Sequence, residues 1–239
     1  MKEIFRIRPA NEKTVEELAD SYLWFSRPTA YNDVNDANIF AFVKSNEALE
    51  MAFKRVYENY PEIARLSGLS GICCFTEEFP EAKIIREFPG SKKGLVIVYD
   101  KNLLEQHFIG RFALGDCFKR VDYLEHPTMF KSLGEQDILW EDDGNLQTYK
   151  PMTAITSDVR IMDQLFLKMF TRIHWRFGNQ KELRIILGGT NIPDKSDGLM
   201  GYQIKIPKEA ILKILVHPEI DVDILKSIEK LGYIIERLS

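Results

Sequence analysis

Apolar residues alternate with polar ones, or run without interruption, in eight short stretches of the chain. Both patterns are typical of strands, which bury one face or both faces of a sheet. They predict strands at residues 4–8, 22–26, 71–76, 94–100, 119–124, 182–187, 202–206 and 211–216.

Apolar residues at helical spacing predict helices at 45–66, 157–174 and 222–231. A polar, Glu-rich stretch predicts a further helix at 11–20, with Thr14 as its cap. Because strands and helices follow one another without regular alternation, their order favours an α+β fold with mostly antiparallel pairing.

One stretch, 132–151, fits neither pattern. It contains Gly134, Gly144 and Pro151, with four acids between positions 137 and 143. We expect it to form an exposed loop or insert on a single domain that spans residues 1–239.

The composition narrows the class of protein. The 239 residues are 45% hydrophobic and 28% charged, which are ordinary values for a globular protein. No apolar run reaches about 18 residues, so we expect no membrane-spanning segment. The 32 basic against 36 acidic residues exclude an overall polycation but allow a local basic patch. Three cysteines, an odd number, and a charged N-terminus unlike a secretory signal favour a cytoplasmic location.

Basic residues gather at the C-terminal end of the predicted helix before position 175 and just beyond it. Lys168, Arg172 and Arg176 are four residues apart, and Arg184 follows them. Trp175 lies in the same stretch. Cations beside aromatic rings suit a phosphate-bearing ligand, either a nucleic acid or a dinucleotide. The alternative is an ordinary solvated helix face.

Gln180 and Glu182 stand where the predicted strand 182–187 begins, and strand geometry would place them on one face. A fixed carboxylate there would stabilise a cationic sugar centre while the amide orients the attacking group, so both are candidate catalytic residues. The alternative is an ion pair of Glu182 with Arg184 or Lys181.

Other reactive groups follow weaker patterns. The four histidines lack the spacing of metal ligands, so no metal is expected. Asp33 and Asp36 lie in a turn-rich stretch and leave open a nuclease that uses a divalent ion. Cys73 and Cys74 lie in a predicted buried strand, where a small apolar role competes with that of a nucleophile.

Six short motifs follow one another along most of the chain. Among them are a short Arg-bearing opening strand, Phe-Ser-x-Pro-x-x-Tyr-Asn-Asp-x-x-Asp, Cys-Phe-Thr and a late Gln-x-Glu. The residues that carry the motifs are 5–8, 25–36, 74–76, 88–100, 121–123 and 175–184. Together they resemble a bacterial family of unknown function that is often found near phage-defence and abortive-infection genes. Three positions depart from the family pattern, because Ile85 replaces a Trp, Glu87 a His and Gln180 a Glu.

The family pattern is similar in turn to that of ADP-ribosyltransferases, including DNA-modifying toxins of the DarT type. This resemblance implies a split sheet, NAD as substrate and a catalytic Glu on a late strand, here Glu182 with Gln180. The residues that it implies for binding NAD are Arg8, Arg6, Phe25, Ser26, Tyr31 and Asn32. The two arginines share one face of a strand, where they could hold a pyrophosphate.

Two hypotheses follow. The first is an NAD-dependent ADP-ribosyltransferase-like toxin or defence effector, with a nucleic acid or protein as acceptor and, for a toxin, an antitoxin as partner. The second is a non-catalytic module of a phage-defence system that binds or senses a nucleotide or nucleic acid.

Overall fold

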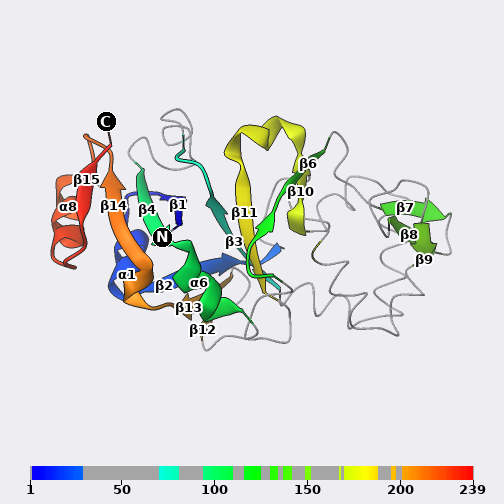
Figure 1. Ribbon diagram of the computed structural model, residues 1–239, viewed down its shortest axis with the longest axis horizontal. Coiled ribbons are helices and arrows are strands. Elements are labelled where there is room, and N and C mark those ends of the chain that lie inside the picture. The colour runs from blue at the N-terminus through cyan, green and yellow to red at the C-terminus, as the bar shows by residue number, and fades with distance from the viewer. Residues whose placement is uncertain are drawn as a thin grey trace.

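The structure is a computed structural model. It describes residues 2–28, 70–80, 94–109, 116–124, 130–133, 137–141, 149–151, 167, 170–187, 195–197 and 201–238. In this part of the chain a largely antiparallel ten-stranded sheet is combined with three α-helices, which is an α+β fold (Figure 1). No helix in these ranges is long and apolar enough to cross a membrane.

The main sheet collects strands from both ends of the chain. Its members are β1 (Glu3–Arg8), β2 (Tyr22–Ser26), β3 (Gly71–Thr76), β4 (Leu95–Asp100), β5 (Lys119–Arg120), β11 (Glu182–Leu187), β12 (Lys195–Asp197), β13 (Gly201–Lys205), β14 (Ile211–Val216) and β15 (Ile235–Arg237). The helices are α1 (Glu12–Ala19), α6 (Lys101–Phe108) and α8 (Val222–Glu229), and the 3-10 turns are η3 (Trp175–Gln180) and η4 (Lys208–Ala210).

Five further strands form two small sheets. The parallel pair is β6 (Asp122–Leu124) with β10 (Arg172–His174). The antiparallel set is β7 (Phe130–Leu133), β8 (Asp137–Glu141) and β9 (Tyr149–Pro151). Figure 1 draws this second set at the far end of the view from β14 and β15.

The main sheet divides at β3. One edge of β3 pairs with β11 along six residues. The other edge meets β1 at the single pair Phe5–Thr76 and β2 at the single pair Ser26–Ile72. One arm of the sheet therefore continues through β1, β4, β14 and β15, and the other through β2, β13 and β12.

The two faces of the sheet are covered differently. Residues of α1, α6 and α8 join the large apolar core on one face, which we call the helix-covered face. This core contains Ile4, Phe75 and Ile185. The opposite face carries a smaller apolar cluster of Phe5, Val96, Val98 and Leu215.

Most predicted strands are confirmed. Those at 4–8, 22–26, 71–76, 94–100, 182–187, 202–206 and 211–216 shift by one residue at most. The strand at 119–124 is interrupted at Val121, whose N–H donates to the carbonyl of Glu182 at 3.2 Å. The helix at 222–231 ends at Glu229, and the helix predicted at 45–66 lies outside the described residues.

Two details of the prediction were wrong. Asn11, not Thr14, caps α1, because its side chain accepts the N–H of Thr14 at 3.0 Å while the Thr14 hydroxyl donates to Pro9. The helix predicted to reach 174 gives way to β10 at Arg172, because pairing with β6 overrides the apolar helical spacing. The stretch 132–151, predicted as an exposed loop or insert, includes the end of β7 and all of β8 and β9, and its glycines fall between these strands.

Candidate functional site

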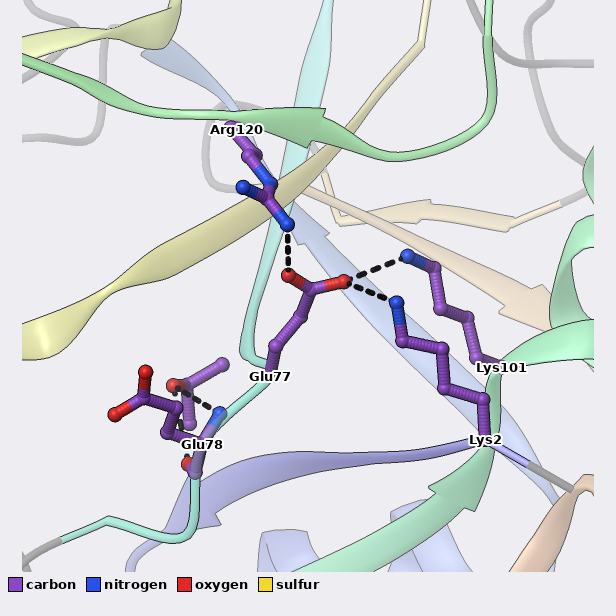
Figure 2. Close-up of polar contacts among 6 residues, drawn as sticks. Lys2, Glu77, Glu78, Lys101 and Arg120 are labelled. Atoms are coloured by element: carbon purple, nitrogen blue, oxygen red, sulfur yellow. Dashed lines mark hydrogen bonds and ion pairs between the residues drawn. The ribbon is translucent and has the colours of Figure 1, made fainter.

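Three cationic side chains converge on the carboxylate of Glu77, which follows the end of β3 (Figure 2). The ammonium groups of Lys2 and Lys101 donate to Oε1 at 3.0 and 2.9 Å. The Arg120 guanidinium donates to Oε2 at 2.8 Å. Lys2 precedes β1, Lys101 begins α6 and Arg120 ends β5, so four separate segments build this cluster.

The cluster carries more positive than negative charge, because Glu77 faces three cations. Hydrogen bonds from Lys101 and Lys2 lower the pKa of Glu77 to about 2, so the carboxylate is ionised at neutral pH. The side chains of Arg120 and Lys2 are 79% and 58% exposed. Lys101 is mostly covered and lies over the ring of Phe118 at 5.3 Å. The cluster therefore presents two exposed cations to solvent beside one that is mostly covered.

The cluster continues into η3 through an ion pair. Glu78 points away from the three cations in Figure 2, and its carboxylate pairs with the ammonium of Lys181. Lys181 follows η3 directly and has a left-handed backbone, with φ of 44°. Both side chains are exposed, so the pair adds little stability. The ends of η3 and β3 lie side by side because Glu182, directly after Lys181, pairs with Thr76, directly before Glu77.

The η3 segment presents aromatic and cationic side chains together. Trp175 is 60% exposed, and the exposed Arg176 stacks on the ring of Phe177 at 4.5 Å. His174 caps the segment, accepting the N–H of Arg176 at 3.3 Å. Phe79 follows Glu78, the partner of Lys181, and it is 53% exposed and touches Phe5 edge-on. Two exposed rings thus lie on the two segments that this ion pair joins.

We call this surface the basic edge. It consists of the cations Lys2, Lys101, Arg120, Arg176 and Lys181 and the rings Trp175 and Phe79.

The candidate catalytic carboxylate is held by its own strand. Both oxygens of Glu182 accept hydrogen bonds from Arg184, at 3.2 Å from Nε and 3.0 Å from Nη2. The backbone N–H of Glu182 donates to the Tyr123 hydroxyl at 2.8 Å. Burial raises the pKa of Tyr123 to about 12, so this hydroxyl stays protonated. The ion pair of Glu182 with Arg184, which the sequence offered as an alternative to a catalytic role, is present in the structure.

Gln180 does not share a strand face with Glu182, so that prediction was wrong. Gln180 is the last residue of η3, and the left-handed Lys181 separates it from the start of β11. The alternation of a strand begins only at Glu182. Gln180 is exposed beside the basic edge.

Arg6 and Arg8 share a face as predicted, but both are ion-paired within the protein. Glu17 of α1 binds the guanidinium of Arg6 through one oxygen and that of Arg8 through the other, the latter at 2.7 Å. Arg6 also donates to the carbonyl of Trp24 at 3.0 Å. Arg6 of β1 thereby bonds to the backbone of β2, and both strands meet the same edge of β3.

The implied NAD-binding residues and Glu182 are divided between the two faces. Antiparallel partners point to the same side, and Phe5, Thr76 and Glu182 are partners across β1, β3 and β11. Glu182 therefore lies on the opposite face, whereas Arg6 and Arg8 alternate with Phe5 and point to the helix-covered face. The structure does not bring these groups together.

The remaining implied contacts are placed as follows. Phe25 is fully buried and packs on Phe108, so its ring belongs to the core and presents no surface for nicotinamide. Ser26 is partly exposed and shares the opposite face with Ile72. Tyr31 and Asn32 lie outside the described residues. Positions 85 and 87, where the family pattern has Trp and His, lie outside them as well.

The basic residues predicted to contact phosphate do not form one exposed surface in the described part of the chain. Arg172 and Arg184 are buried, so neither reaches an external phosphate. Arg184 is buried because β11 is covered on both faces. The Arg184 guanidinium also donates to the carbonyl of Phe170 at 2.7 Å. Arg176 is exposed, and Lys168 lies outside the described residues.

Two of the three cysteines, Cys73 and Cys117, are buried and lack the features of a nucleophile. Burial raises the pKa of Cys73 to about 11 and that of Cys117 to about 12, which keeps both thiols protonated at neutral pH. Among the described residues no group of three His, Cys, Asp or Glu side chains lies close enough to hold a metal ion. Asp33 and Asp36 lie outside those residues.

Sequence reasoning missed Glu77 and its three partners. The sequence does contain one signal, which is that charged residues directly follow two buried strands. Glu77 and Glu78 follow the strand 71–76, and Lys101 follows the strand 94–100. Strand ends that share one edge of a sheet come close together, but which ends share an edge follows only from the pairing.

The fold and site define an α+β protein with a split, largely antiparallel sheet and a basic edge. No protein-family model, curated protein or solved structure gives a match to this chain.

Proposed function

We propose that this protein binds a single strand of nucleic acid along the basic edge. The observation that carries the proposal is the presence of cations and of two exposed rings, Trp175 and Phe79, on segments that the Glu78–Lys181 ion pair joins. Cations neutralise the phosphates of a strand, and rings stack on its bases whatever the sequence.

The dimensions of the surface support a strand rather than a single nucleotide. Trp175 begins η3, which ends at Gln180 and rises roughly 2 Å per residue, or about 12 Å in all. Lys181 follows η3 and is paired with Glu78, which lies between Glu77 and Phe79 in the chain. A ligand that contacts both Trp175 and Lys181 must span the length of η3, which favours a strand of several units.

Fluorescence anisotropy with a labelled oligothymidine, measured over a series of salt concentrations, tests the proposal. We expect Trp175→Ala to weaken binding by about 1–3 kcal/mol, the contribution of one stacked base. Lys181→Gln should lower the salt dependence of log K by about 0.7, the value for one phosphate contact on a single strand.

Matched controls come from the other end of the sheet. Ile234 is as exposed as Trp175, and Lys230 is an exposed lysine after α8. Ile234→Ala and Lys230→Gln should leave binding and its salt dependence unchanged. Failure of the wild type to bind at low salt, or equal losses in controls and test variants, would refute the proposal.

A second candidate is the ADP-ribosyltransferase activity, on an ADP-ribosyltransferase-like split-sheet fold. The observation in its favour is that Arg184 holds the Glu182 carboxylate in one orientation, two residues from the exposed Gln180. In this reaction the bond between the ribose anomeric carbon and nicotinamide breaks, with its electron pair leaving on nicotinamide. An acceptor nucleophile then bonds to that carbon and loses a proton, and Glu182 would stabilise the positive charge that develops.

The two candidates are compatible, because a strand bound at the basic edge would be the acceptor. The NAD phosphates would need partners other than Arg6, Arg8 and Phe25, which lie on the far side of the sheet. As a toxin or defence effector the protein would act in the cytoplasm, and a dedicated antitoxin would be its partner.

Release of nicotinamide from NAD, with cell lysate as a source of acceptors, tests this activity. Wild type is compared with Glu182→Gln and with lysate alone, after thermal unfolding shows that the variant is folded. Release by the wild type only is the expected result. Equal release by a folded Glu182→Gln variant would remove Glu182 from the chemistry.

A further inference from the structure

We infer that Lys2, Lys101 and Arg120 form a site for a terminal phosphate of the strand, which the Glu77 carboxylate fills in the structure described here. The identity of this ligand rests on the proposed function. An incoming phosphate would displace Glu77, so that Glu77 acts as an internal competitor of the ligand.

The geometry is that of an anion site. Donors from three elements point at two oxygens of one carboxylate, all within 3.0 Å. Phosphate offers the same kind of oxygen acceptor in larger number, and guanidinium and ammonium groups bind both anions by charge-assisted hydrogen bonds. The side chains of Lys2 and Arg120 are mostly exposed, so a ligand reaches them without opening the core.

Displacement of Glu77 breaks three ion pairs, and two of them have exposed cations, Lys2 and Arg120. Ion pairs whose cation is exposed contribute little stability, because solvent screens them. The pair with the mostly covered Lys101 is the one that an incoming phosphate must replace with a bond of its own. Lys101 stays in place, because the Phe118 ring lies under its ammonium group and because the backbone N–H of Lys101 donates to the carbonyl of Lys2 at 2.9 Å.

The charge balance favours a terminal phosphate over an internal one. Glu77 sets one negative charge against three positive charges. A phosphate monoester carries close to two negative charges at neutral pH, whereas a phosphodiester within a strand carries one. A terminal phosphate therefore matches the three cations better than either Glu77 or an internal phosphate.

The experiment compares two neighbouring carboxylates. Glu77→Gln keeps the shape of the side chain and removes its charge, and Glu78→Gln removes the same charge one residue away, on a side chain that points elsewhere (Figure 2). Anisotropy is measured with a 5′-phosphorylated oligothymidine and its 5′-hydroxyl counterpart. We expect Glu77→Gln to raise the preference for the phosphorylated over the hydroxyl strand roughly tenfold, the equivalent of one charge-assisted hydrogen bond. Glu78→Gln releases Lys181 toward both strands alike, so it should change this preference much less.

Arg120→Gln should abolish the preference for the phosphorylated strand. Equal gains in this preference by Glu77→Gln and Glu78→Gln would show an effect of net charge alone and overturn the inference. So would a wild type that binds both strands equally with no gain in Glu77→Gln, although the proposed function would stand.

Inorganic phosphate separates this inference from the proposed function. If no strand binds, the proposed function fails. The phosphate site then stands if phosphate raises the thermal midpoint of Glu77→Gln more than that of Glu78→Gln or Arg120→Gln, and falls if the three respond alike. The midpoints without phosphate show whether each variant is folded.

Discussion

Removal of the Glu17 carboxylate should be the most damaging single charge change in the described part of the protein. Glu17 is buried on α1 and binds Arg6 and Arg8 of β1. Glu17→Gln keeps the size of the side chain but leaves two guanidinium groups side by side without a counter-charge. Loss of one partner from a buried ion pair costs about 3–5 kcal/mol, since the remaining charge is neither solvated nor paired.

Thermal unfolding followed by circular dichroism measures the effect. In a chain of this size each kcal/mol lowers the midpoint by about 2–4 °C, so the expected fall is roughly 6–20 °C. Glu16→Gln is the matched control, because it removes the same charge from the exposed neighbouring position of the same helix. That variant should unfold within about 2 °C of the wild type, which corresponds to the small effect of most surface changes.

A second substitution tests the mechanism. Arg8→Met in the Glu17→Gln background removes one of the two unpaired charges, and it should recover part of the lost stability although Arg8→Met alone destabilises. This pattern is the signature of direct coupling between neighbouring residues. The reasoning would be refuted if Glu17→Gln lowered the free energy of unfolding by less than about 1 kcal/mol. Strictly additive effects of Glu17→Gln and Arg8→Met would refute it as well.

Three further results are expected. Gly201→Ala should lose about 1–3 kcal/mol in urea unfolding, because a Cβ there would lie 2.4 Å from the carbonyl oxygen of Phe25; Gly178→Ala, with its nearest neighbour at 3.7 Å, should be tolerated. Asn11→Ala should cost about 1 kcal/mol in the same assay through loss of the α1 cap, and no loss would contradict that capping bond. The pKa of Glu77 is lowered from 4.5 to about 2 on folding, so its stabilisation is complete above pH 4.5 and disappears as the pH falls through 2; the acid-unfolding curve of Glu77→Gln should lack this component.

The alternation of apolar residues determined most of the strands. Burial of one face or both is a local requirement, and it leaves a period of two or an apolar run in the sequence wherever the chain joins a sheet. The same parity placed Arg6 and Arg8 on one face. It could not supply their partner, because Glu17 reaches them only through the packing of α1 on the sheet.

Helical spacing was less reliable near residue 172. The apolar stripe continues to Ile173, but the backbone there pairs with β6, some fifty positions earlier in the chain. Local propensity is a weak preference, and a strand partner from elsewhere in the fold overrides it.

The composition of the site was decided by the tertiary structure. Lys2, Glu77, Lys101 and Arg120 follow no common spacing, and they meet because the ends of β1, β3 and β5 and the start of α6 lie at one edge of the sheet. The division of Arg8 and Glu182 between two faces depends on the register of β1, β3 and β11. The sequence shows which residues of one strand point to the same face of the sheet. Which residues of different strands share that face depends on the register of the long-range pairing.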